Sequence, residues 1–203
     1  MSDSSINLPS KIGEPTWEAA YLLPVQGQWT EEDFFKFHSN RMAELVDGTL
    51  EVLPMPTLKH QKLLKWLFKD LEILVERQGG LVLFAPLPVR LFAGRIREPD
   101  LLYIASEHEP ADDVKYPTRI DLAVEIVSEG PDAHQRDYED KRADYARAGV
   151  AEYWIVDPQE QHVIVLALQV GTYQELGTFK PGQTATSKLL PAWSVNVEKL
   201  FSL

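Results

Sequence analysis

The sequence of 203 residues contains no cysteine, which excludes a disulfide framework and any metal site built on thiolates. A bound metal would therefore need oxygen or imidazole ligands. No apolar run approaches the roughly 18 residues that a membrane helix requires, so no membrane contact is expected. The first residues lack the basic and apolar regions of a secretory signal, which predicts a cytoplasmic protein.

Positive charge is also scarce, because 20 lysines and arginines stand against 31 acidic residues and give a net charge of −11. Such a surface disfavours broad contact with nucleic acid, whose phosphates are the main source of non-specific attraction. Net charge does not decide the potential of a single cleft, however, and a bound metal ion would reverse its sign locally. The charge counts against a nuclease without excluding one.

The chain is expected to form one domain with an N-terminal arm. Three prolines and little hydrophobic periodicity mark residues 1–28, which are predicted to be partly disordered and to pack through Trp17 and Tyr21. Thr30 and the three acidic residues that follow it are typical of a helix start. Residues 29–203 are long enough to bury one core of their own.

Hydrophobic periodicity predicts both strands and helices in this domain. Asp47-Gly48 lies between two strand-like runs and predicts a β-hairpin. A helix of about five turns should follow, with His60 on its inward face and Gly79-Gly80 at its end. A second helix is expected at about 133–148. The remaining apolar runs predict strands at 81–84, 88–92, 101–104, 122–127, 152–156 and 162–166, followed by a small β extension.

The predicted strand at 122–127 carries one unexpected charge. It is apolar on both faces, as a central strand covered on both sides would be, except for Glu125. An unpaired carboxylate in such a strand would take up a proton or require a cation. Glu125 should therefore have a partner elsewhere in the chain.

Two positions offer such a partner. Asp100 directly precedes the apolar run 101–104, and Lys141 shares the sheet-facing side of the second helix with Tyr138 and Tyr145. Two carboxylates from neighbouring strands, together with a lysine, would suit a hard cation such as Mg²⁺, which prefers oxygen ligands. The combination favours a functional site over three unrelated residues.

Each of these residues also has a purely structural interpretation. Glu125 could pair with a core arginine or with Lys141, and Asp100 could face water at the start of its strand. Lys141 and Asp137 could form an exposed pair four residues apart on the helix, which would contribute little.

Two further residues give weaker signals. His60 alone is more often a hydrogen-bonded core histidine than a ligand, and Glu44 alone is weaker still, although both remain candidate catalytic residues. Ser128 has no matching arrangement of histidine and aspartate that would activate it as a nucleophile. No glycine-rich phosphate loop follows a strand, which disfavours a nucleotide-binding fold of that kind.

Several segments share a pattern with a known family. They are Glu44 in Glu-Leu-Val-Asp-Gly, His60-Gln61, Pro99-Asp100, the strand through Glu125 to Ser128, and the stretch from Asp137 through Lys141 and Tyr145 to Asp157. Together they resemble the Uma-two family, which belongs to the PD-(D/E)XK nuclease superfamily. The resemblance covers about residues 30–170, and the stretch from the lysine to Glu-Tyr-Trp is its most specific part.

The resemblance implies a fold and one departure from the superfamily pattern. The fold is α/β with a restriction-endonuclease-like core, in which helices flank a mixed central β-sheet, with an N-terminal β-hairpin and a C-terminal β extension. The plain motif places a lysine two residues after the second acid, but Val127 stands there. The resemblance implies that Lys141 supplies the missing lysine from the next helix.

The resemblance also implies roles for the candidate residues. Asp100, Glu125 and the backbone carbonyl of Ile126 would bind Mg²⁺ or Mn²⁺, and Glu44 would complete the shell or hold a second ion. The metal would polarise a phosphodiester. Lys141 would orient the attacking water and stabilise developing negative charge.

Two functional hypotheses remain. The first is a metal-dependent endonuclease that hydrolyses DNA phosphodiester bonds, and the second is an interaction module that keeps the nuclease fold and a metal site but cuts nothing. The acidic surface favours the second, whereas both acids and the lysine together favour the first. A homodimer is a further expectation, since exposed strands within 150–195 could pair edge to edge.

Overall fold

A computed structural model describes residues 22–37 and 42–203, so the predicted packing of Trp17 and Tyr21 lies outside the described residues. The described end of the expected arm lies against the first hairpin. The side-chain amide of Gln26 donates to the carbonyl of Leu50 at 2.9 Å and accepts from the Leu50 amide at 2.8 Å. Residues shortly before the expected boundary at 28 therefore contact the domain.

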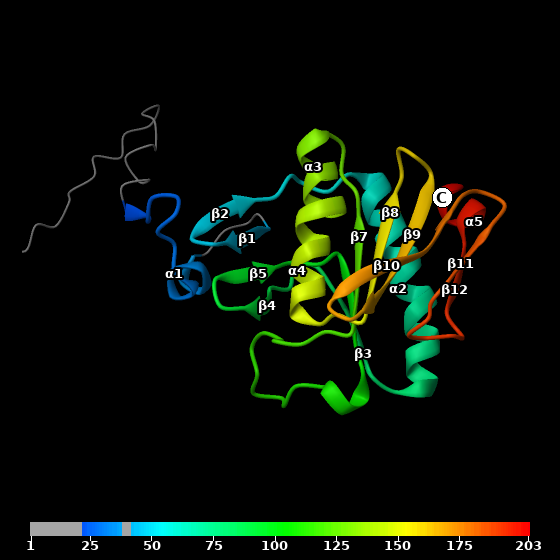
Figure 1. Ribbon diagram of the computed structural model, residues 1–203, viewed down its shortest axis with the longest axis horizontal. Helices are drawn as coiled ribbons and strands as arrows, with labels where there is room; N and C mark the ends of the chain where they lie inside the picture. The colour runs from blue at the N-terminus through cyan, green and yellow to red at the C-terminus, as the bar shows by residue number, and fades with distance from the viewer. Residues whose placement is uncertain (1–21, 38–41) are drawn as a thin grey trace, which may run out of the picture.

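A six-stranded sheet forms the centre of the molecule (Figure 1). Only its two middle strands, β7 and β8, run parallel, while the other neighbours pair antiparallel, which confirms the predicted mixed sheet. The predicted C-terminal β extension partly belongs to this sheet, because β10 forms one of its edges. In spatial order the strands are β10 Thr172–Phe179, β9 His162–Gln169, β8 Glu152–Asp157, β7 Leu122–Ile126, β6 Leu101–Ile104 and β3 Leu81–Phe84.

The predicted N-terminal hairpin is half of a second, antiparallel sheet of four strands. Its order is β2 Thr49–Val52, β1 Ala43–Val46, β5 Arg95–Arg97 and β4 Val89–Phe92. At the hairpin turn both Asp47 and Gly48 have positive φ, as a tight two-residue turn requires. Strand β5 was not predicted, because Ile96 is the only apolar residue in it and a single apolar position gives no alternating pattern.

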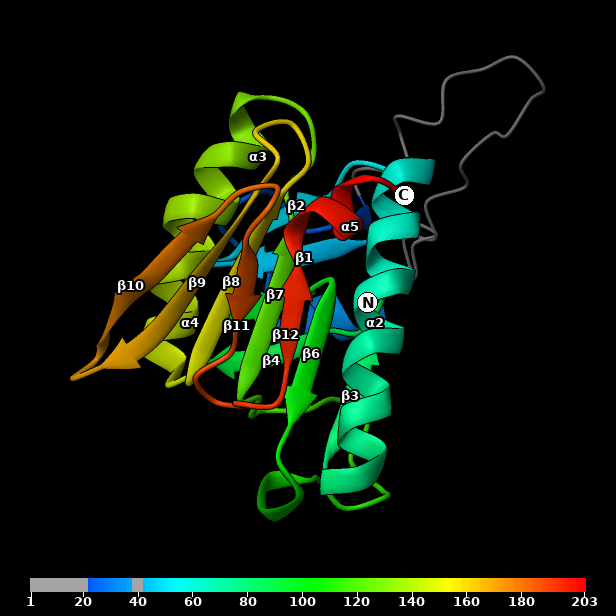
Figure 2. The ribbon, with the colours of Figure 1, turned by 90° about the vertical axis from the view of Figure 1, so that its right-hand side faces the viewer.

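Helices cover both faces of the central sheet (Figures 1 and 2). On one face lies α2, Leu58–Gln78, together with α5, Val197–Phe201, and a small sheet of β11, Thr184–Thr186, and β12, Ser194–Asn196. On the other face lies α4, Lys141–Ala148, which stands between the central sheet and the four-stranded sheet. A short helix α1, Glu31–Lys36, packs on the four-stranded sheet and is capped by Thr30.

The second predicted helix is confirmed but is not regular throughout. It comprises α3, Pro131–Gln135, a π-helical turn at Arg136–Asp140, and α4. A π-helical turn inserts an extra residue into the helical repeat and is often found at functional sites. Here the turn ends directly before Lys141.

Alternation along β7 decides where its charged residue points. Leu122, Val124 and Ile126 belong to the core on the α2 side, whereas Ala123 and Val127 belong to the core that contains Tyr145 of α4. Side chains of a strand point alternately to its two faces, so Glu125 faces α4. None of the helices in the described part of the chain is both long and apolar enough to span a membrane.

Candidate active site

The two candidate carboxylates come from neighbouring antiparallel strands. Leu101 of β6 pairs with Val124 of β7, so one further step in the register places Asp100 opposite Glu125. Side chains of directly opposed residues lie on the same face of a sheet, with Cβ atoms about 4.5–5.5 Å apart. Asp100 is 8% exposed and Glu125 is 3% exposed. The alternative that Asp100 simply faces water is therefore wrong.

Lys141 lies between two buried carboxylates. Its ammonium nitrogen is 2.9 Å from Oε1 of Glu125 and 3.0 Å from Oε1 of Glu44. The Asp137 carboxylate lies 3.9 Å away, and both Asp137 and Lys141 are 2% exposed. The alternative of an exposed helical pair is therefore wrong. The lysine is held by two charges instead.

An arginine that sequence analysis did not single out secures Glu44 from the other side. Arg97 of β5 donates from one terminal nitrogen to Oε2 of Glu44 at 2.8 Å, and its other terminal nitrogen lies 2.7 Å from Oδ2 of Asp144 on α4. Its Nε donates to the same Asp144 oxygen at 2.9 Å. Arg97 therefore joins the four-stranded sheet to α4 and orients the carboxylate that holds Lys141.

His60 is a buried, hydrogen-bonded histidine whose partner is the candidate residue Asp100. Its Nε2 lies 3.1 Å from Oδ2 of Asp100, and the same oxygen accepts a hydrogen bond from the amide of Ile126 at 2.7 Å. The first turn of α2 begins at the cap Thr57 and so brings His60 to the end of the central sheet. Two donors thus fix one oxygen of Asp100.

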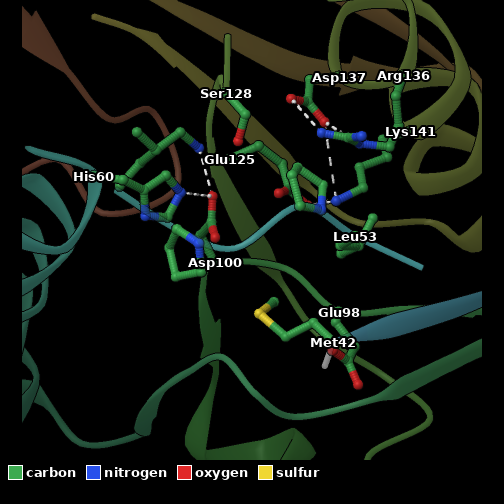
Figure 3. A pocket seen from close by; sticks show the side chains of 13 residues that line it. Met42, Leu53, His60, Glu98, Asp100, Glu125, Ser128, Arg136, Asp137 and Lys141 are labelled. Carbon is green, nitrogen blue, oxygen red and sulfur yellow. Dashed lines mark hydrogen bonds and ion pairs between the residues drawn. The ribbon is translucent and has the colours of Figure 1, made fainter. Parts of the chain in front are cut away.

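His60, Asp100, Glu125 and Lys141 line a small cavity of about 30 Å³ (Figure 3). About 10–15 Å³ suffices for one water molecule, so the cavity has room for about two water-sized groups and for no nucleotide. A larger hollow of about 370 Å³ adjoins it and shares Pro54, His60 and Ser128 with it. The cavity is lined by Met42, Leu53, Pro54, Pro56, His60, Glu98, Asp100, Glu125, Ile126, Ser128, Arg136, Asp137 and Lys141.

The carboxylates of the site differ in their protonation. Burial opposes ionisation of Glu44, but the charges of Lys141 and Arg97 outweigh it and lower the pKa of Glu44 to about 2. Burial raises the pKa of Glu125 to about 8, because the negative charges near it offset the attraction of Lys141. Burial and the charge of Glu44 raise the pKa of Glu98 to about 7. Glu44 is therefore ionised at neutral pH, whereas Glu125 and Glu98 take up protons readily, and a cation bound nearby would favour their ionised forms.

The donor set suits a hard cation, although the side chains are not gathered into a finished metal site. Within residues 22–37 and 42–203 no group of three or more acidic or histidine side chains is close enough to hold a metal ion as it stands. The cavity nevertheless collects four carboxyl side chains, and Oε2 of Glu98 is buried without a hydrogen bond. These oxygen donors fit Mg²⁺ or Mn²⁺, which retain several waters as ligands.

Comparison with known proteins places the chain in a family. The sequence model of the Uma2 family, described as "Putative restriction endonuclease", matches residues 28–198. The chain belongs to the Uma2 family. No curated protein matches it. A solved structure described as a "putative nuclease belonging to DUF820" from Anabaena variabilis ATCC 29413 is similar, with 21% identity, a TM-score of 0.72, and coverage of 86% of this chain and 98% of that one.

Membership of the Uma2 family supports a nuclease-type function and, with the structural likeness, the nuclease-like fold. The structure brings together all five candidate side chains from the sequence, namely Glu44, His60, Asp100, Glu125 and Lys141. Sequence analysis did not single out Arg97, and it placed Tyr145 on the sheet-facing side of the helix without a role in the site. The Tyr145 hydroxyl donates to Oε1 of Glu125 at 2.6 Å. Neither residue had a local signal, since each gains its role from partners distant in sequence.

Proposed function

We propose that this protein is a divalent-metal-dependent endonuclease that hydrolyses phosphodiester bonds of DNA. The observation that carries the proposal is the convergence of Asp100, Glu125 and Lys141 on one cavity at the end of the central sheet. Two carboxylates and an ammonium group on a nuclease-like fold match the needs of metal-assisted phosphodiester hydrolysis. Membership of the Uma2 family supports the same reaction class.

Asp100, Glu125 and the carbonyl of Ile126 would hold the metal ion, and Mg²⁺ and Mn²⁺ both suit these oxygen ligands. When bound, the ion would polarise the phosphodiester and offset negative charge that develops on it. His60 and the Ile126 amide would keep Asp100 oriented through the oxygen that both contact. Its other oxygen has no hydrogen-bond partner among the described residues and is left for the metal.

Lys141 would act on the attacking water and the phosphate. Its ammonium group is held by Glu44 and Glu125, so its charge occupies one place without reorganisation during the reaction. The surrounding carboxylates, against the effect of burial, raise the pKa of Lys141, so the lysine stays protonated. It would therefore orient water and stabilise negative charge and would not serve as a general base.

Plasmid cleavage and metal binding test the proposal together. The wild type should nick or linearise supercoiled DNA in Mg²⁺ or Mn²⁺ and lose this activity in EDTA. Asp100→Asn should abolish both cleavage and the binding of Mn²⁺ measured by titration calorimetry, whereas Asp112→Asn, a matched change in an exposed loop, should preserve both. Cleavage by Asp100→Asn at the wild-type rate would contradict the assignment.

The net charge of −11 favours a second candidate, an interaction module that retains the metal site without cutting nucleic acid. The same experiment separates the two candidates. Binding of Mn²⁺ that depends on Asp100, without cleavage of any plasmid by the wild type, would favour the interaction module. A homodimer and a cytoplasmic location also remain proposals, which sedimentation and cell fractionation would test.

A further inference from the structure

The outer face of α2 carries positive charge on an acidic protein. Lys59, Lys62, Lys65 and Lys69 are all exposed, and no acidic residue lies between the start of the helix at Leu58 and Lys69. We call these four residues the lysine stripe. The whole chain, by contrast, has a net charge of −11. The stripe is therefore a local reversal of the overall charge.

The helical repeat places the stripe opposite the buried face of α2. The buried residues are His60, Leu63, Leu64, Leu67, Leu71 and Val75, which recur every three or four positions as an inward face does. The lysines recur at similar intervals on the other side. At 1.5 Å per residue, the stripe extends over about 15 Å.

The stripe is not explained by the stability of the helix. Negative side chains are favourable at a helix N-terminus and positive ones at the C-terminus, because of the helix dipole. Helix α2 has Lys59 and no acidic residue in its first turn, and its acidic residues Asp70, Glu72 and Glu76 all lie in its second half. Nor does any carboxylate in residues 22–37 and 42–203 form an ion pair with these lysines. Their charge is available to a partner.

The stripe begins at the candidate active site. Lys59 lines the hollow of about 370 Å³ together with His60 and Ser128, and these two residues also line the smaller cavity. The Lys59 ammonium donates to the carbonyl of Pro158 at 3.2 Å. From there α2 runs along the sheet away from the site (Figure 2). A DNA strand with one phosphate at the cavity could therefore continue along the lysine stripe.

We propose that the lysine stripe binds the backbone phosphates of the DNA substrate beside the cleaved bond. This inference rests on the proposed endonuclease function and names the surface that holds the substrate. One strand of duplex DNA carries a charge every 3.4 Å along its axis, so about 15 Å of helix faces about four phosphates. Four lysines match that number. The stripe also offers DNA phosphates a local positive surface on a protein whose net charge of −11 would otherwise repel them.

The test compares two variants with the same change in net charge. Lys62→Glu/Lys65→Glu alters the stripe, and Lys115→Glu/Lys180→Glu alters exposed lysines on loops elsewhere. Binding of a fluorescent duplex is measured by anisotropy in EDTA, which prevents metal-dependent cleavage, over a series of salt concentrations. Loss of two phosphate contacts should reduce the slope of log K against log salt by about 1.8, since each contact contributes about 0.9. The control should keep the wild-type slope.

Folding is followed by thermal melting. Both lysines are exposed and have no ion-pair partner among the described residues, so the stripe variant should melt close to the wild-type temperature. Equal slopes of log K against log salt for the stripe variant and the wild type would contradict DNA binding by the lysine stripe. Cleavage, and with it the proposed function, would be unaffected by that result. Binding of the wild type to anionic vesicles but not to DNA would also contradict DNA binding by the lysine stripe. If the wild type neither binds DNA nor cleaves a plasmid, both the proposed role of the lysine stripe and the proposed endonuclease function would be contradicted.

Discussion

The ammonium nitrogen of Lys141 lies 2.9 Å from Oε1 of Glu125, and both side chains are buried. The pair joins a helix to the strand that it covers. An ion pair removed from water is costly to break on one side only, because the remaining charge has neither solvent nor partner. The lysine therefore has two functions, a proposed catalytic one and a structural one, and experiments must separate them.

A double-mutant cycle on this pair should reveal strong coupling. Lys141→Met should lower the free energy of unfolding by about 3 kcal/mol, because it removes the buried partner of Glu125 and one of the two cations that hold Glu44 ionised. Adding Glu125→Gln should restore part of this loss, with a coupling energy of about 1–3 kcal/mol. Urea denaturation measures the free energy of unfolding of the wild type, both single variants and the double variant. DNA cleavage should be absent in all three variants. Additive effects of the two substitutions would contradict direct coupling.

Arg97→Ala should destabilise the protein far more than Arg90→Ala. Arg97 is 1% exposed and pairs with Glu44 and Asp144, so its loss should cost about 3–5 kcal/mol and weaken cleavage by freeing Glu44. Arg90 pairs with Glu31 at 2.6 Å, but its side chain is 40% exposed, and its loss should cost less than about 1 kcal/mol. Chemical denaturation compares them. Similar losses would argue against the buried network as a support of the site.

Tyr145→Phe should affect metal binding, whereas Tyr173→Phe should not. Each substitution removes one buried hydroxyl, and each hydroxyl donates one hydrogen bond, to Glu125 at 2.6 Å and to the carbonyl of Val150 at 2.8 Å, respectively. Both should cost about 1–3 kcal/mol of stability. Only Tyr145→Phe releases a proposed ligand, so it alone should weaken Mn²⁺ affinity, by about 10–100-fold. Equal affinities in calorimetry would show that the tyrosine is purely structural.

Much of the site could be predicted from local sequence. Glu125 could be singled out because burying an unpaired carboxylate in a strand that is apolar on both faces is costly. Lys141 was conspicuous because helical periodicity turned it towards the sheet. Both predictions use only the repeat of one element, and the structure places both side chains in the interior. Their proposed metal and catalytic roles remain to be tested.

Other features had no local signal. Strand β5 contains Arg95 and Arg97 around a single apolar residue, so its pattern does not predict a strand. It forms because β1 and β4 pair with it on both sides. The π-helical turn before Lys141 could not be predicted either, since the sequence pattern there is that of a regular α-helix. Pairing across the chain and packing against the sheet decide both features.

The sequence by itself determined the alternation of strands and helices, the hairpin at Asp47-Gly48 and the inward orientation of Glu125 and Lys141, because these follow from side-chain periodicity and turn chemistry. Only the tertiary structure decided which charges meet. Glu44, Arg97 and Asp144 come from three separate elements, and their pairing depends on how the four-stranded sheet docks on α4. Charges that are distant in sequence interact only once the fold has removed the water between them.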